Sequence, residues 1–135
     1  TIARNARQNG VSDKIRIFSK AASNFPDVLE DVEWEQTIVL CDIEGAEFDL
    51  LDESCLDRLS KATILIEVHN WIENFRLKYH NFLKNAAQRF DIELLERSVL
   101  PRQSFPELRG YTDDNRMLML SEGRPNIMRY LLLSN

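Results

Sequence analysis

The sequence predicts an α/β domain with a mostly parallel sheet, and three observations support this fold class. Two short apolar runs rich in β-branched residues, at residues 37–41 (TIVLC) and 63–66 (TILI), have the composition of strands buried on both faces. Between these runs, apolar residues recur at helical spacing, at Phe48, Leu51, Cys55 and Leu59. A strand, a helix and a second strand in that order form a right-handed crossover unit, which joins parallel neighbours.

The flanking segments extend this unit into a layered domain with helices on both faces of the sheet. Residues 2–9 have the pattern of the last turns of a helix, and residues 14–18 (KIRIF) alternate polar and apolar as a strand does. A helical apolar face follows, at Phe75, Tyr79, Phe82, Leu83, Ala86 and Phe90. Further strands are predicted at residues 92–95 and 117–120 (MLML). No helical pattern separates this last pair, so we expect an antiparallel return at the sheet edge.

Composition places the chain among ordinary globular domains. It has 135 residues, of which 44% are hydrophobic and 29% charged, so one domain covers residues 1–135. The formal net charge of -5 excludes binding of nucleic acid or an anionic membrane through bulk charge. No apolar stretch has the length of a membrane span, and two cysteines make no disulfide scaffold. These features predict a reduced, cytoplasmic protein.

Acidic residues and a histidine follow the two apolar strands. Asp42 and Glu44 come after the first strand, and Glu67 and His69 close the second. Because ligands in open α/β sheets bind beyond the carboxyl ends of the strands, we expect these four side chains at one rim of the sheet. Glu47 falls in the first turn of the following helix, where a negative charge suits the helix dipole, and we interpret it as a capping residue.

Three further side chains near these strands have ordinary structural interpretations. Trp34 and Trp71 flank the strands, and packing in the core is the preferred interpretation of both over stacking on a ligand ring. His80 lies on the predicted helix and is interpreted as a surface residue.

Residues 38–51 (IVLCDIEGAEFDLL) resemble the signature of the FkbM-type S-adenosylmethionine-dependent methyltransferases. In that family a strand ends in an Asp-x-Glu-Gly-x-Glu pattern and runs into a helix. Residues 64–69 (ILIEVH) resemble the family's next strand, which commonly ends in Glu-x-His. Residues 5–10 and 14–23 are similar to its helix, third strand and Ala-rich loop. The resemblance covers the first half of the chain well and the remainder only through the order of elements.

This resemblance implies a class I methyltransferase (Rossmann-like) fold that transfers a methyl group from S-adenosylmethionine, usually to an oxygen of a small hydroxyl compound or glycan. The cofactor-binding residues that it implies are Ala21, Ala22, Asp42 and Glu44. The catalytic residues that it implies are Asp42, Glu67 and His69, with His69 as the general base that takes the hydroxyl proton. This mechanism uses no metal. In the alternative, Asp42, Glu44 and Glu67 hold a divalent cation that activates the hydroxyl.

The family's Gly-rich cofactor loop is missing, because none of the four glycines, at positions 10, 45, 110 and 123, forms a Gly-x-Gly pattern. We therefore expect an N-terminally truncated domain that is inactive alone. The strand at residues 37–41 would lie at an exposed sheet edge, covered by more of the same protein or by a second copy in a homodimer. A non-catalytic interaction module derived from a methyltransferase and a metal-dependent hydrolase are the alternative functions.

Overall fold

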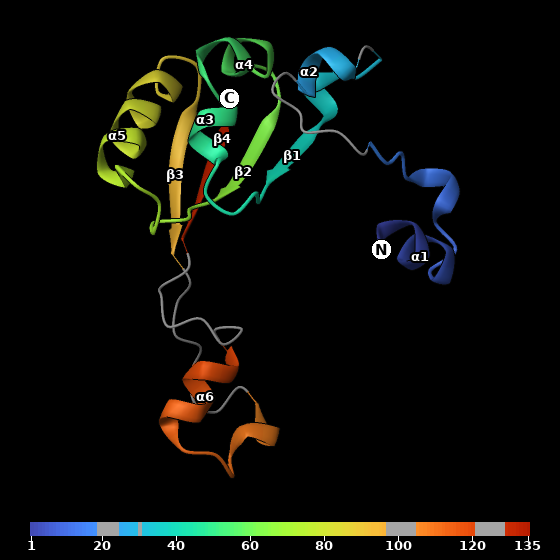
Figure 1. The fold of residues 1–135 in the computed structure, drawn as a ribbon, viewed down its shortest axis with the longest axis vertical. Helices are drawn as coiled ribbons and strands as arrows, with labels where there is room; N and C mark the ends of the chain where they lie inside the picture. The colour runs from blue at the N-terminus through green and yellow to red at the C-terminus, as the bar shows by residue number, and fades with distance from the viewer. Residues whose placement is uncertain (19–24, 30, 97–104, 121–128) are drawn as a thin grey trace.

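A computed structural model describes residues 1–18, 25–29, 31–96, 105–120 and 129–135 (Figure 1). The α/β class predicted from the sequence is confirmed. The strands are β1 (Ile38–Cys41), β2 (Thr63–Glu67), β3 (Asp91–Glu96) and β4 (Arg129–Ser134). The α-helices are α1 (Ile2–Gln8), α2 (Phe25–Val28), α3 (Glu47–Leu50), α4 (Glu53–Arg58), α5 (Phe75–Ala86) and α6 (Asp113–Leu120). Three short 3-10 helices are η1 (Ser12–Lys14), η2 (Trp34–Gln36) and η3 (Pro106–Leu108).

The four strands form one mixed sheet in the order β1-β2-β4-β3. Strands β1 and β2 are parallel, whereas β4 runs antiparallel to both β2 and β3. The prediction of a mostly parallel sheet with an antiparallel edge is therefore wrong in its detail, because only the β1–β2 pairing is parallel. The reversed strand lies inside the sheet. It comes from the apolar C-terminal run of leucines, whose side chains at 131 and 133 are buried.

Two predicted strands are wrong. Residues 14–18 follow a 3-10 turn and form no strand, and Ile15, Ile17 and Phe18 are exposed there. Residues 117–120 belong to helix α6 instead. Met and Leu are good helix formers, and the run follows two aspartates that suit the start of a helix. The strand that pairs antiparallel with β3 is β4, which comes later in the chain than the predicted one.

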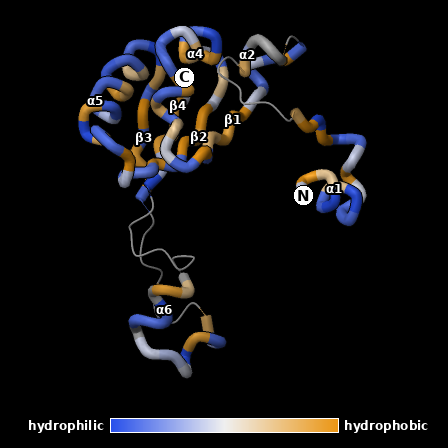
Figure 2. Tube along the Cα trace, viewed as in Figure 1, coloured by the Kyte–Doolittle hydropathy of each residue, from blue (hydrophilic) through white to orange (hydrophobic). Residues whose placement is uncertain are grey.

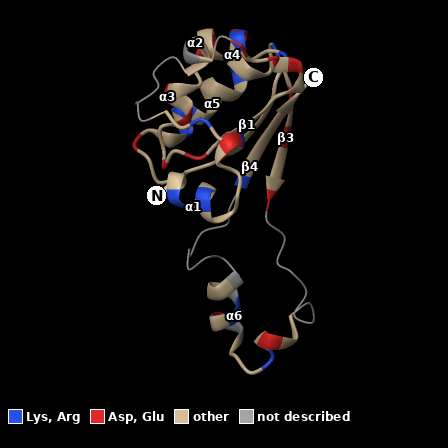
Figure 3. Ribbon diagram, turned by 90° about the vertical axis from the view of Figure 1, so that its right-hand side faces the viewer, with Lys and Arg blue, Asp and Glu red and all other residues tan. Residues whose placement is uncertain are grey.

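The core lies between the sheet and helices α3, α4 and α5, which all pack on the same face of the sheet (Figure 3). The crossover between β1 and β2 consists of two short helices, because Asp52 interrupts the first and caps the second by accepting a hydrogen bond from the Cys55 N–H at 2.9 Å. The core includes the fully buried Leu56, Leu59, Ile64, Ile66 and Leu133. The sequence predicted helices on both faces of the sheet, but α3, α4 and α5 all cover the same face.

On the opposite face of the sheet, β1 exposes apolar side chains. Ile38 and Leu40 are 76% and 68% exposed, while Val39 and Cys41 between and after them point to the covered face. Figure 2 shows that β1 is as hydrophobic as its neighbours in the sheet. Strand β1 also forms one end of the strand order, so the edge predicted for this strand is present.

Helices of the described ranges are all too short or too polar to cross a membrane.

The two cysteines are free and buried in the core, as the sequence predicts for Cys41. Burial in apolar surroundings raises the pKa of the Cys41 thiol from its ordinary value of 9.0 to about 12, and the nearby Glu47 carboxylate adds to the shift. Burial likewise raises the pKa of Cys55 to about 11. Both thiols therefore stay protonated in the folded chain at neutral pH.

We expect the folded state to lose stability as the pH rises above about 9, the value at which an unfolded thiol ionises. Above that pH the unfolded chain releases the two thiol protons while the folded chain retains them, so ionisation favours unfolding. Urea denaturation at pH 8 and pH 10 measures this loss. The variant Cys41→Ala should show a smaller loss than the unmodified chain, and an equal loss in both would contradict the assignment.

Candidate functional site

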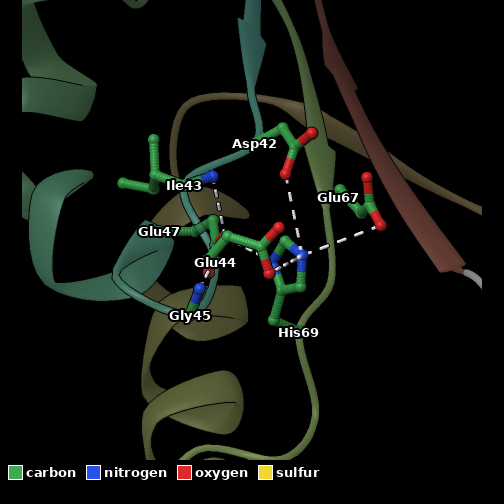
Figure 4. A network of polar contacts seen from close by, with 7 residues as sticks. All are labelled: Asp42, Ile43, Glu44, Gly45, Glu47, Glu67 and His69. Atoms are coloured by element: carbon green, nitrogen blue, oxygen red, sulfur yellow. Dashed lines mark hydrogen bonds and ion pairs between the residues drawn. The ribbon is translucent and has the colours of Figure 1, made fainter.

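The candidate site lies where β1 and β2 end, at the same edge of the sheet (Figure 4). Parallel pairing brings the two carboxyl ends together, so Asp42 after β1 lies opposite the end of β2. His69 follows β2 by two residues. Its position is fixed by continued pairing with β4, because the Val68 N–H donates to the Arg129 carbonyl at 2.9 Å.

The side chains predicted to share this rim do meet. The Nε2 atom of His69 lies 3.6 Å from Asp42 Oδ1 and 3.7 Å from both Glu44 Oε2 and Glu67 Oε1. These distances exceed a hydrogen bond, so the three carboxylates surround the nitrogen without direct bonding. The other two predicted cofactor contacts, Ala21 and Ala22, lie outside the described residues.

Glu47 supplies the contact that holds the imidazole, and its interpretation as a helix cap alone is wrong. Its Oε1 accepts a 2.5 Å hydrogen bond from Nδ1 of His69, and both residues are fully buried. The same oxygen accepts from the backbone N–H groups of Ile43 at 3.2 Å and Gly45 at 3.0 Å. A carboxylate that accepts from the ring requires a proton on Nδ1, and in the neutral tautomer with that proton the lone pair is on Nε2.

The loop between β1 and α3 makes a left-handed turn that aims its acids at the histidine. Glu44 has φ +57° and Gly45 has φ +107°, so two consecutive residues lie in the left-handed region. A Cβ atom at Gly45 would stand only 2.4 Å from Cγ2 of Ile72, so the loop also passes too close to this residue for a side chain. Two constraints therefore favour glycine at this position: its positive φ angle and the close approach of the Ile72 side chain.

Burial divides the site into an inner and an outer part. The inner residues His69, Glu47 and Glu67 are buried, whereas the side chains of Asp42 and Glu44 are 47% and 69% exposed. Within the described part of the chain, Nε2 of His69 and Oε2 of Glu47 are buried with no hydrogen-bond partner. Buried polar atoms normally have partners, so an unpartnered lone pair that faces an accessible acidic rim is the mark of a binding or reacting atom.

Trp71 belongs to the site rather than to the core, contrary to the interpretation from sequence. It is 53% exposed, and its ring meets the His69 ring edge-to-face with centroids 4.7 Å apart. The closeness of Trp71 to His69 along the chain is the signal for this contact, since residues 70 and 71 form a turn in which strand alternation does not apply. Trp34, by contrast, packs against the core as predicted. His80 is exposed on α5, as expected.

We expect Gly45→Ala to disrupt the loop and lower the free energy of unfolding by about 1–3 kcal/mol, the usual range for a side chain forced into occupied space. Gly110→Ala is the matched control, because no atom lies within 4 Å of the position of its Cβ. Urea unfolding followed by circular dichroism measures both. Equal stability of the two variants would show that the turn is not constrained as described.

Searches against protein-family models, curated proteins and solved structures find no match to this chain.

Proposed function

We propose that the rim formed by Asp42, Glu44, Glu67 and His69 is the acceptor site of an S-adenosylmethionine-dependent methyltransferase that methylates a hydroxyl group of a small molecule or glycan. The proposal joins the resemblance of residues 38–51 and 64–69 to the FkbM-type signature with the geometry at the ends of β1 and β2. The observation that carries it is the buried, unpartnered Nε2 of His69, held toward the rim by Glu47.

The chemistry of this reaction makes modest demands that the site can meet. S-adenosylmethionine, when bound, supplies a methyl group that its sulfonium has already activated. What the protein must add is alignment of the acceptor hydroxyl and removal of its proton. In the metal-free site, the Nε2 lone pair of His69 takes that proton, and Glu47 stabilises the imidazolium through Nδ1. Asp42 and Glu67 accept hydrogen bonds from neighbouring hydroxyls of the acceptor.

The carboxylates of the rim suit the positively charged and hydroxyl groups of the cofactor. Carboxylates attract a positively charged sulfonium and accept hydrogen bonds from ammonium and ribose hydroxyls, and the exposure of Asp42 and Glu44 supports this role for them. The Gly-x-Gly loop that would let backbone approach the methionine part is absent from the 135 residues. We therefore propose that this chain alone binds the cofactor weakly and is inactive.

The edge and open face of β1 support a second, structural proposal. We propose that this edge is covered in the functional protein, and that a second copy of the chain can cover it. Ile38 and Leu40 present an apolar surface beside a strand edge that no other described strand pairs with, a combination that favours strand addition. The same surface favours an interaction module as the alternative function. The two free thiols suit the cytoplasmic setting that we propose.

S-adenosylhomocysteine should bind this chain more weakly than the micromolar range, and binding should be centred on the rim. In ¹⁵N-resolved NMR spectra at millimolar ligand, we expect shifts at residues 42–47 and 67–71, reduced in Asp42→Asn. Asp49→Asn, which removes an exposed acid of α3 outside the rim, should leave them unchanged. Shifts of equal size in Asp42→Asn, or shifts confined to residues outside the rim, would contradict the assignment of the cofactor contact to Asp42, and micromolar affinity would contradict the expected weakness.

Leu40→Lys should reduce self-association, because a charge on the open face of β1 opposes strand addition there. Sedimentation velocity over a range of concentrations measures the effect. Leu77→Lys is the matched control, since Leu77 is a similarly exposed leucine on α5. A chain that stays monomeric before substitution, or equal loss of association in both variants, would count against pairing through β1.

A further inference from the structure

The site contains a donor set that suits a metal ion as well as a hydroxyl group. One ligand atom each from Asp42, Glu67 and His69 lies within 4.8 Å of the other two. Carboxylates alone would not indicate a cation. The second, independent observation is the fully buried imidazole of His69, whose unpartnered Nε2 faces Asp42 Oδ1 and Glu67 Oε1 (Figure 4).

The spacing of these atoms matches the first coordination shell of a divalent ion. With an ion bound, the distances of 3.6 Å and 3.7 Å from Nε2 to the carboxylate oxygens would be two edges of its coordination polyhedron. In a tetrahedron, such edges correspond to bonds of about 2.2 Å, close to the lengths found for zinc with nitrogen and oxygen ligands. Small rotations of the partly exposed Asp42 side chain adjust the remaining tenths of an ångström.

The surroundings of the histidine also match those of metal-binding imidazoles. A histidine that binds a metal through one nitrogen usually donates from the other nitrogen to a carboxylate, which fixes its orientation and raises its basicity. Glu47 occupies this position, with Oε1 at 2.5 Å from Nδ1. Its burial and its two backbone hydrogen bonds keep it there. The imidazole is therefore held with the lone pair of Nε2 directed at the rim.

We propose that Asp42, Glu67 and His69 bind a divalent first-row transition-metal ion such as Mn²⁺ or Zn²⁺, with Glu47 orienting the histidine and at least one coordination position left open. One imidazole and two carboxylates favour such ions over Mg²⁺ and Ca²⁺, which prefer oxygen ligands alone. Three protein ligands and an open position are typical of catalytic rather than structural sites. Glu44 Oε2, 3.7 Å from the same nitrogen, is a further carboxylate at this rim.

This inference is independent of methyl transfer, because the chain can bind a metal ion whether or not it binds S-adenosylmethionine. Where both occur, an acceptor hydroxyl at the open position would lose its proton more readily to Glu44 or to water, and His69 would be a ligand instead of the base. Metal binding without any response to S-adenosylhomocysteine would favour a metal-dependent hydrolase over the methyltransferase and would leave the metal site intact.

Titration of the untagged chain with MnCl₂, followed by the electron paramagnetic resonance signal of free Mn²⁺, tests the site directly. We expect one Mn²⁺ per chain, and competition by Zn²⁺ but not by equimolar Mg²⁺. Asp42→Asn should weaken binding at least ten-fold, and Glu47→Gln should weaken it by about ten- to hundred-fold, the usual effect of losing a carboxylate behind a metal-binding histidine. Asp49→Asn, an exposed acid outside the cluster, should bind as the unmodified chain does.

Asp42→Asn decides the outcome even where a buried substitution prevents folding, because Asp42 is partly exposed and its replacement keeps the shape of the side chain. Circular dichroism confirms that each variant is folded. Failure of the folded chain to bind millimolar Mn²⁺ would overturn the proposal. Binding to Asp42→Asn with unchanged affinity would overturn it equally, because the ion would then lie elsewhere.

Discussion

The buried hydrogen bond between Glu47 and His69 is the interaction on which the rest of the site depends. A buried carboxylate is costly unless its oxygens are bonded. Oxygen Oε1 offsets much of that cost by accepting from the imidazole and from two backbone N–H groups of its own loop. The bond thereby connects the segment after β1 to the segment after β2, at the edge where both strands end. It also fixes which nitrogen of the histidine faces the acids.

The order of the strands explains why one side of the site is more constrained than the other. Strand β2 is paired with β1 on one side and with β4 on the other, and this pairing continues past β2 at Val68. His69 therefore follows a strand that has a partner on each side. Asp42 follows an edge strand with a single partner and is half exposed. The imidazole is therefore fixed, whereas the half-exposed Asp42 carboxylate has room to change its rotamer.

The sequence predicts the parts of this structure that depend on local pattern. It fails where the structure of a segment depends on contacts with residues far away in the chain. The β1–β2 unit, α5 and the meeting of Asp42 with His69 followed from apolar runs and from the rule that ligands bind at strand ends. Residues 14–18 alternate as a strand does, but a strand needs a neighbour, and no described strand pairs with them. A four-residue apolar run at 117–120 fits helix and strand equally, so its pattern could not decide. Glu47 was misassigned because an acid in the first turn of a helix looks the same in the sequence whether it caps that helix or contacts a histidine 22 residues away.

The polarity of the site restricts what can bind there more than its shape does. Carboxylate oxygens, and Nε2 of His69 in the tautomer that carries its proton on Nδ1, accept hydrogen bonds and donate none. A ligand that complements them must bring protons, as hydroxyl and ammonium groups do, or positive charge, as a sulfonium or a metal ion does. A phosphate or carboxylate ligand would meet only like charge from Asp42, Glu44 and Glu67. The methyl-transfer and metal proposals thus arise from one constraint. The acidic residues at the ends of β1 and β2 make the rim favourable for hydrogen-bond donors and for cations.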